Sequence, residues 1–198
     1  MDNKEQLSLT LDQLIRAARE IQYSEDLVPA QWEALRYLAR ANKYSLTPSM
    51  VANFLGTTKG TASQTLRSLE SKGYVKRVQS TLDKRVTIVT PTPAGLEKLE
   101  TDPLGTVLKL VDGEGREEKE ILLKSLERLL TLMKTQNNGC HFGYCPQCRN
   151  FQKSKSKFGN ENVGFCRLAN EELKETEISK ICAKFTQLPT FSPNSPKR

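Results

Sequence analysis

Histidine is nearly absent from this chain, and cysteine is absent from most of it. The single histidine is His141, and all five cysteines lie between Cys140 and Cys182, so the first 139 residues contain none. Six of the seven phenylalanines also lie beyond residue 141. Cysteines used only for packing would be spread along the chain, so this concentration predicts ligands gathered for one metal centre.

The sequence also lacks the patterns of membrane proteins, exported proteins and the common enzymes. No run approaches the ~18–20 apolar residues that cross a bilayer, and the first five residues include acids where a signal peptide has a basic start. We therefore expect a cytoplasmic protein with no membrane partner, in which reduced thiols favour metal or redox chemistry over disulfides. His-Glu-x-x-His, Gly-x-Ser-x-Gly and phosphate-loop patterns are missing, so we do not expect an enzyme.

Length and charge set broad limits on domains and partners. A chain of 198 residues can hold one large domain or two small ones, and its net charge of +7 favours an anionic partner, although a merely basic protein would have the same charge. The cysteine distribution predicts a division into residues 1–138, a cysteine-rich module at 139–188, and a tail at 189–198. That tail is rich in Pro, Ser and Lys, which is typical of disorder.

Hydrophobic spacing predicts a mainly helical chain with one small β-hairpin. Apolar residues recur at helical spacing, and threonine or proline marks several helix starts. Two short segments rich in β-branched residues, 74–78 and 86–90, flank a polar turn with a basic tip and predict the hairpin. The predicted helices cover residues 5–22, 30–41, 47–55, 57–72, 93–111 and 117–136.

Two helices joined by a tight turn and followed by a hairpin predict a winged helix-turn-helix, and the residues resemble one family in detail. Segments 47–56 and 57–77 resemble the first helix, the recognition helix and the first wing strand of MarR-type regulators. Asp83-Lys84-Arg85 resembles the Asp-x-Arg of that family's wing, and 92–95 its turn into the next helix. Residues 80–82 depart from the acidic Asp-Pro pair that the family often has there, which leaves the length of the wing open.

The resemblance, which covers residues of about 5–136, implies a transcriptional regulator with a helical dimerisation region. MarR-type proteins are homodimers joined by their first helix and last two helices, and they bind palindromic operators in double-stranded DNA. The apolar faces at 7–21 and 121–133 suit such a dimer. Packing within one chain would give the same periodicity, and the sequence alone does not separate the two.

The predicted recognition helix and wing tip carry the residues that we expect to contact DNA. If Ala62, Leu66 and Leu69 face inward, the polar residues between them fall on or beside the open face, where they can reach phosphates or base edges. Arg85 at the wing tip suits a narrow minor groove, and Asp83 can hold its guanidinium. A solvated helix face and an ordinary turn are the alternatives. The predicted DNA-binding residues are Lys59, Thr61, Ser63, Gln64, Arg67, Asp83, Lys84 and Arg85.

The cysteines permit two sets of four ligands. The first three with Cys166 follow the plant-type ferredoxin order, but the small-residue loop of that family is replaced by residues 141–144. The second set has an apolar or aromatic neighbour beside each member and is favoured here. It consists of Cys145, Cys148, Cys166 and Cys182, with Cys140 as a possible alternative ligand.

Segments 145–151, 164–168 and 181–185 resemble the small cysteine modules on subunits of some glycyl-radical enzymes. That resemblance implies an iron–sulfur cluster, of the 4Fe–4S type. Zinc is the alternative cofactor, since Cys-Pro-x-Cys is a common zinc-binding turn. Only one Cys-x2-Cys unit is present, whereas zinc sites more often pair two, so iron–sulfur is favoured. His141 beside the site is expected to be a supporting or surface group rather than a ligand.

These features together predict a DNA-binding regulator whose cluster senses redox state, oxygen, nitric oxide or iron supply and alters DNA affinity. The alternative is a DNA-binding regulator with a purely structural zinc module, or with one that docks a partner.

Overall fold

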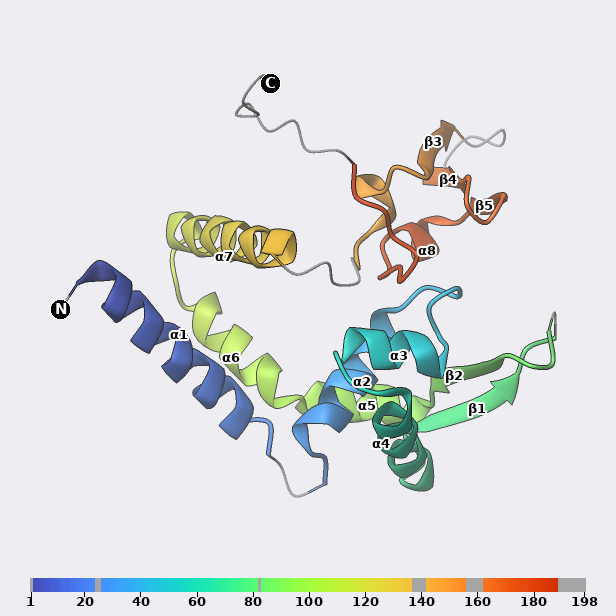
Figure 1. Cartoon of the computed structure of the whole chain (residues 1–198), viewed down its shortest axis with the longest axis horizontal. Helices are drawn as coiled ribbons and strands as arrows, with labels where there is room; N and C mark the ends of the chain where they lie inside the picture. The colour runs from blue at the N-terminus through green and yellow to red at the C-terminus, as the bar shows by residue number, and fades with distance from the viewer. Residues whose placement is uncertain (1, 24–25, 82, 137–141, 156–161, 189–198) are drawn as a thin grey trace.

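The computed structural model describes residues 2–23, 26–81, 83–136, 142–155 and 162–188. Cys140, His141 and the predicted tail at 189–198 lie outside the described residues. Figure 1 shows a helical body from which a two-stranded hairpin projects, with a small sheet-containing unit on the far side of the body from α4. Within the described residues, no helix is long and apolar enough to cross a membrane.

Three helices form the centre of the molecule, and their starts follow from local sequence. They are α2 (Pro29–Arg40), α3 (Pro48–Phe54) and α4 (Lys59–Ser71). Proline occupies the first turn of α2 and α3, where its missing N–H costs no hydrogen bond. The Thr58 hydroxyl caps α4 by accepting a hydrogen bond from the Thr61 N–H at 3.1 Å. Gly56, with a φ of +60°, makes the tight turn between α3 and α4.

The hydrophobic core lies among these helices and the base of the hairpin. Ala62, Leu66 and Leu69 are completely buried, so the prediction of the inward face of α4 is confirmed. Truncating a leucine in such a core costs about 2–5 kcal/mol. The core consists of Leu27, Trp32, Ala34, Leu35, Tyr37, Leu38, Ala41, Val51, Ala52, Ala62, Leu66, Leu69, Val75 and Val89.

The hairpin pairs β1 (Val75–Gln79) with β2 (Thr87–Pro91) in antiparallel register. Both strands begin one residue later than predicted. Val75 and Val89 anchor its base in the core, and the Val89 N–H donates to the Leu46 carbonyl at 2.8 Å. At Gly95 the chain passes so close to the Tyr74 carbonyl oxygen that a Cβ would lie 2.0 Å from it, so only glycine fits there.

The prediction of a single helix at 93–111 is wrong. The structure has α5 (Pro93–Lys98), a 3₁₀ turn η1 (Leu99–Thr101) and α6 (Pro103–Asp112). The break has a steric cause, because the ring of Pro103 disfavours helical backbone at Asp102, which adopts a ψ of 122°. The Asp102 carboxylate then caps α6 through the Leu104 N–H at 3.0 Å and pairs with Arg36 at 2.8 Å.

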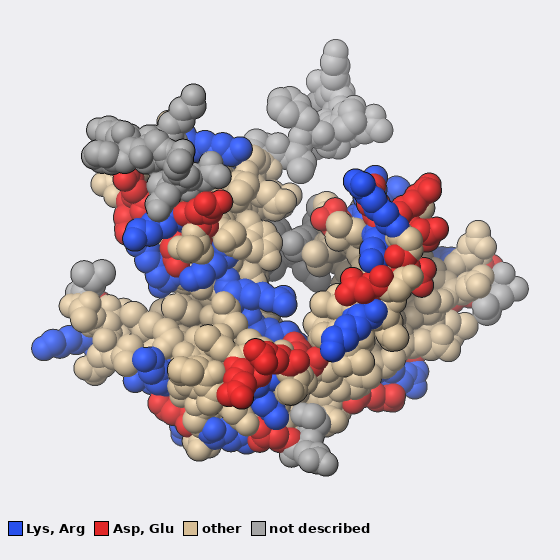
Figure 2. Space-filling view, turned by 180° about the vertical axis from the view of Figure 1, so that it is seen from behind, with Lys and Arg blue, Asp and Glu red and all other residues tan. Residues whose placement is uncertain are grey.

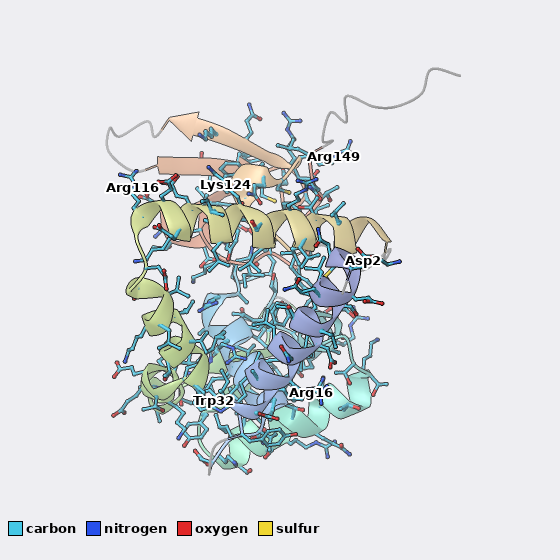
Figure 3. The ribbon with its side chains drawn as sticks, turned by 90° about the vertical axis from the view of Figure 1, so that its left-hand side faces the viewer. Asp2, Arg16, Trp32, Arg116, Lys124 and Arg149 are labelled. Atoms are coloured by element: carbon cyan, nitrogen blue, oxygen red, sulfur yellow. The ribbon has the colours of Figure 1, made fainter. Side chains whose placement is uncertain are left out.

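Three helices lie together on one side of the molecule, with α7 crossing above α1 and α6 (Figures 1 and 3). They are α1 (Asn3–Glu20), α6 and α7 (Arg116–Gln136), and no residue of α1 or α6 is buried. Their exposed apolar side chains include Leu7, Leu14, Ile15, Leu108, Leu110, Ile121, Leu122, Leu126, Leu130 and Met133. Packing within this chain therefore does not account for their apolar faces.

The cysteine-rich part contains a small sheet that the sequence did not predict. Strands β3 (Phe151–Lys155), β4 (Asn162–Cys166) and β5 (Glu171–Leu173) pair antiparallel in that order. A 3₁₀ turn, η2 (Cys145–Gln147), precedes the sheet, and a short helix, α8 (Glu175–Ile178), follows it. The unit lies beside α3, on the opposite side from α4 (Figure 1).

Candidate nucleic-acid interface and cysteine site

The outer face of α4 presents most of the predicted DNA-contacting residues to solvent. Lys59, Thr61, Gln64 and Arg67 are exposed, and Ser63 is half-buried. The Arg67 Nε donates to the Ser63 carbonyl at 3.3 Å, which turns the guanidinium along the helix. The buried leucines on the other face hold α4 against α2 and α3, so this polar face is the outer surface of the helix-turn-helix.

The wing tip contains a two-point ion pair. The Arg85 Nε lies 3.1 Å from Asp83 Oδ1, and the Arg85 Nη2 lies 3.2 Å from Asp83 Oδ2. The Arg85 guanidinium, aided by the Arg85 backbone N–H at 3.0 Å, lowers the pKa of the Asp83 carboxyl. The Arg85 side chain is 91% exposed, and Lys84 beside it is exposed as well. Asp83 thus fixes the direction of a cation that has its outer side free.

A second arginine joins the wing to α4, and sequence reasoning missed it. The Arg77 Nε on β1 lies 3.1 Å from Glu70 Oε2, and its Nη2 donates to the Ser63 carbonyl at 3.2 Å. Arg77 lay inside the segment that resembled a recognition helix and wing, but its partners are not visible in the sequence. These contacts fix the wing strand relative to α4.

A cluster of one carboxylate, one tyrosine and two lysines joins the loop before α2 to the end of α4. The Asp26 carboxylate accepts hydrogen bonds from the Tyr74 hydroxyl and lies 3.3 Å from the ammonium groups of both Lys72 and Lys98. The Tyr74 hydroxyl contributes most to lowering the pKa of Asp26, and the same contact raises the pKa of Tyr74. The cluster ties the loop before α2 to the base of the wing.

The overall charge does not by itself mark a DNA surface. Figure 2, seen from behind, shows Lys, Arg, Asp and Glu side chains interspersed over that face. The features that point to nucleic acid are therefore the placed residues of α4 and the wing, rather than the net charge of +7.

The structure brings all four favoured cysteines to the lining of one pocket. Cys145, Cys148, Cys166 and Cys182 line it together with apolar side chains that include Phe151, Leu168 and Leu173. All four are free thiols, and Cys145 and Cys148 are buried. They come from four places in the chain: the start of η2, the residue after it, the end of β4 and the stretch after α8.

Backbone pairing holds the cysteine segments in place. Phe151 on β3 is paired with Cys166 on β4, Cys182 forms an isolated bridge with Gly143, and Cys148 forms one with Gln187. The closeness of the thiols is also visible in their electrostatics. Burial raises the pKa of Cys145 to about 11, and the neighbouring thiols, Cys182 foremost, act in the same direction.

The winged helix supplies one wall of this pocket. Asn42 and Tyr44, from the loop between α2 and α3, line it beside the cysteines. The Tyr44 hydroxyl donates to Glu171 Oε2 at 2.5 Å, and Lys43 pairs with the same carboxylate. Burial raises the pKa of Tyr44, and Glu171 adds to the effect. Sequence reasoning missed this wall, because residues 42 and 44 lie about a hundred positions before the cysteines.

The four thiols are the metal-binding side chains that the lining of the pocket brings together. Among the residues that the structure describes, no group of three Cys, His, Asp or Glu side chains is arranged to hold one metal ion. The four cysteines share a pocket. The ligand set, its metal and the spare roles of Cys140 and His141 stay predictions.

A family model described as "MarR family" matches residues 25–86. Among curated proteins, a riboflavin kinase from Thermoplasma volcanium is 34% identical over 93 residues, which make up 47% of this chain and 35% of that protein. This chain spans about a third of the length of that relative, so the match assigns no kinase activity to it.

Among solved structures, a probable transcriptional regulator from Pseudomonas aeruginosa matches with a TM-score of 0.52 and 21% identity, over 65% of this chain and 99% of that one. A mutant MarR from E. coli gives 0.51 and 23%, over 66% and 97%. A MepR–DNA complex from S. aureus gives 0.50 and 23%, over 67% and 99%. At these identities the likeness shows the fold, and it confirms the predicted winged helix with its small hairpin.

Proposed function

We propose that this chain, whose winged helix matches the MarR family model, is a DNA-binding transcriptional regulator. The observation that carries this proposal is the polar outer face of α4 beside the Asp83–Arg85 pair, within a fold that S. aureus MepR presents to DNA. In this proposal α4 lies in a major groove, where Lys59 and Arg67 contact phosphates or guanines and Gln64 reads a base edge. Arg85 enters the adjacent minor groove.

We also propose that the functional form is a homodimer joined by α1, α6 and α7. A second copy of this chain is the partner that fits, because all three helices, which lie on one side of the molecule (Figure 3), carry exposed leucine side chains. Exposed leucines in such number on three neighbouring helices are unusual on a monomer. A two-fold dimer places two α4 helices on successive major grooves, about 34 Å apart, and so requires a palindromic operator in double-stranded DNA.

For the cysteine site we propose a 4Fe–4S cluster held by Cys145, Cys148, Cys166 and Cys182. The lining of the pocket includes Phe151, Leu168 and Leu173, which would help to exclude water and oxidants from a group held there. Zinc sites more often pair two Cys-x2-Cys units, and this chain has one.

The proposed role of the site is sensing. A cluster held by these four cysteines would supply redox chemistry, and its loss or oxidation would give the pocket a filled and an altered state. For that change to regulate, the two states must favour different placements of the DNA-contacting elements. The second candidate function is DNA binding with a structural zinc module, since Cys145-Pro146-Gln147-Cys148 is a turn that zinc also uses.

Two measurements test these proposals. Protein purified without oxygen is expected to carry roughly four irons per chain and to absorb broadly at about 400 nm through thiolate-to-iron charge transfer. Stoichiometric zinc without iron would contradict the proposed cluster and favour the structural zinc module. Selection of DNA fragments from a random pool should yield palindromic sites whose affinity falls steeply with salt, and a failure to enrich any site would contradict the regulator.

A further inference from the structure

The segment that carries Cys182 is bonded to the winged helix on both sides of the cysteine. Before it, the Ile181 N–H donates to the Arg40 carbonyl at 2.7 Å, and the Ile181 carbonyl accepts from the Asn42 N–H at 2.9 Å. After it, the Ala183 N–H donates to the Ser45 Oγ at 2.9 Å. These three hydrogen bonds therefore hold Cys182 at the pocket, beside the loop between α2 and α3.

Ser45 is at the centre of these contacts between the Cys182 segment and the winged helix. Its side chain is completely buried, and its Oγ accepts from Ala183 while donating to Asn42 Oδ1 at 2.6 Å. Its carbonyl accepts from the Tyr37 hydroxyl at 2.9 Å, which fixes the loop against α2. Asn42, the partner of the hydroxyl, is 1% exposed and lines the cysteine pocket. One buried hydroxyl thus bonds both the segment of Cys182 and a wall of the pocket.

The same loop leads directly into the DNA-contacting elements. One residue beyond Ser45, the Leu46 carbonyl accepts from Val89 on the wing at 2.8 Å, and the next residue, Thr47, caps α3. Phe142, at the start of the cysteine-rich part, packs edge-on against Phe54 of α3, with ring centroids 5.2 Å apart. A displacement of the loop would therefore reach both the helix-turn-helix and the wing.

We infer that Ser45 is a positioning residue of the cysteine site, and that residues 41–47 rather than α7 carry its state to the DNA-contacting elements. This inference rests on the proposed cluster and on the proposed sensing. An ordinary packing contact would have the same hydrogen bonds, but it would not change with the state of the pocket. The covalent route from α7 passes through residues 137–141, so the two routes can be separated by experiment.

The first test uses the full-length parent protein and no variant. Amide hydrogen exchange is compared between the iron-loaded protein and the same protein after the iron has been removed by oxidation and chelation. Exchange at residues 41–47 should become at least about tenfold faster without iron, as expected when a closed segment opens locally, while α7 stays unchanged. A change confined to α7, or no change in either segment, would overturn the inference.

The second test uses Ser45→Ala, with Ser49→Ala on α3 as its matched control. The parent is expected to bind its operator with affinities that differ by about 5–150-fold between the iron-loaded and iron-free forms. Ser45→Ala should bring this ratio toward one and release iron faster to a chelator, while Ser49→Ala and a glycine–serine insertion after Gln136 should keep the parent ratio. Circular dichroism checks that Ser45→Ala is folded. A ratio kept by folded Ser45→Ala and abolished by the insertion would assign the link to α7.

The failures can be told apart. A parent that binds neither iron nor zinc refutes the metal site, and equal affinities of its iron-loaded and iron-free forms refute sensing. If exchange at 41–47 still responds to iron in that second case, Ser45 remains a positioning residue of the site and the regulatory part of the inference is lost.

Discussion

Arg85 and Asp83 form a two-point pair at the wing tip, with nitrogen–oxygen distances of 3.1 and 3.2 Å, and the arginine side chain is nevertheless 91% exposed. The pair restricts the guanidinium to few orientations and leaves its outer edge free for a ligand. An exposed ion pair of this kind contributes little to stability. We therefore expect the pair to orient the Arg85 guanidinium toward a ligand rather than to stabilise the fold.

Arg85→Ala is expected to weaken operator binding by about 1–3 kcal/mol, the range for loss of a groove contact. Asp83→Asn should have a smaller effect in the same direction, because it removes the orientation but keeps the cation. Electrophoretic mobility shifts at several salt concentrations measure both. Arg116→Ala, which removes an equally exposed arginine from α7, is the control, and an Arg85→Ala shift equal to that of Arg116→Ala would show that the wing does not touch DNA.

On α4, Gln64→Ala and Lys59→Ala should differ in kind. Gln64 is expected to read a base, so its loss should relax specificity at one operator position, at a cost of about 1–3 kcal/mol for the preferred sequence. Lys59 is expected to contact phosphate, so its loss should weaken binding to all sequences and reduce the salt dependence by about one released counterion. A panel of single-base operator variants distinguishes the two. If both variants lost the same affinity on every operator, Gln64 would not read a base.

The dimer proposal predicts that a charge on an exposed apolar face of α1 or α7 dissociates the protein. Ile15→Glu and Leu126→Glu each place a carboxylate on side chains that are 59% and 48% exposed in one chain, so folding of the single chain should survive. Sedimentation should show monomers where the parent is a dimer, and operator binding should fall with it. Leu96→Glu on α5, at a 51% exposed leucine outside these helices, is the control. Monomeric parent protein would contradict the proposal directly.

Much of the fold could be predicted because its signals are local. Helical spacing and the threonine and proline starts located α2, α3 and α4 to within about two residues, and the buried leucines of α4 followed from the same pattern. The break at Pro103 was missed because the apolar spacing continues across it, while the steric effect of the proline on Asp102 decides the backbone. Strand β5 has only three residues, too few for a period to be recognised.

The candidate sites were predictable only in part, for the same reason. The four cysteines could be chosen from their spacing and neighbours, and the structure does bring them to one pocket. The wall made by Asn42 and Tyr44, and the Ser45 contact with Ala183, join residues about 100 to 140 positions apart. Such pairings depend on how two folded parts meet, and no local pattern in a single sequence encodes them.

The Asp26 cluster predicts how stability depends on pH. Because its contacts lower the pKa of Asp26 from the ordinary value of 3.8, its stabilising contribution is fully present above that value and is lost as the pH falls through the lowered pKa. Tyr74 acts oppositely, since its pKa is raised above 10.0, and its contribution is lost as the pH rises through that raised pKa. Asp26→Asn should therefore flatten the acid side of a stability–pH curve measured by denaturant unfolding. An unchanged acid limb in Asp26→Asn, matching that of the exposed-carboxyl control Asp112→Asn, would remove the cluster from the explanation.

The ligand set makes the sharpest prediction for the cysteine site. Changing Cys145, Cys148, Cys166 or Cys182 singly to serine should abolish the iron absorbance, because a site closed by four thiolates loses its group when one ligand is removed. Cys140→Ser and His141→Ala should keep most of it, and together they serve as controls from the same stretch of chain. Iron content and the spectrum of anaerobically purified variants measure the outcome. If Cys140→Ser loses the absorbance and Cys182→Ser keeps it, the ferredoxin-like order is the correct ligand set. The hydrogen bonds of Ser45 would then position a cysteine that is not a ligand.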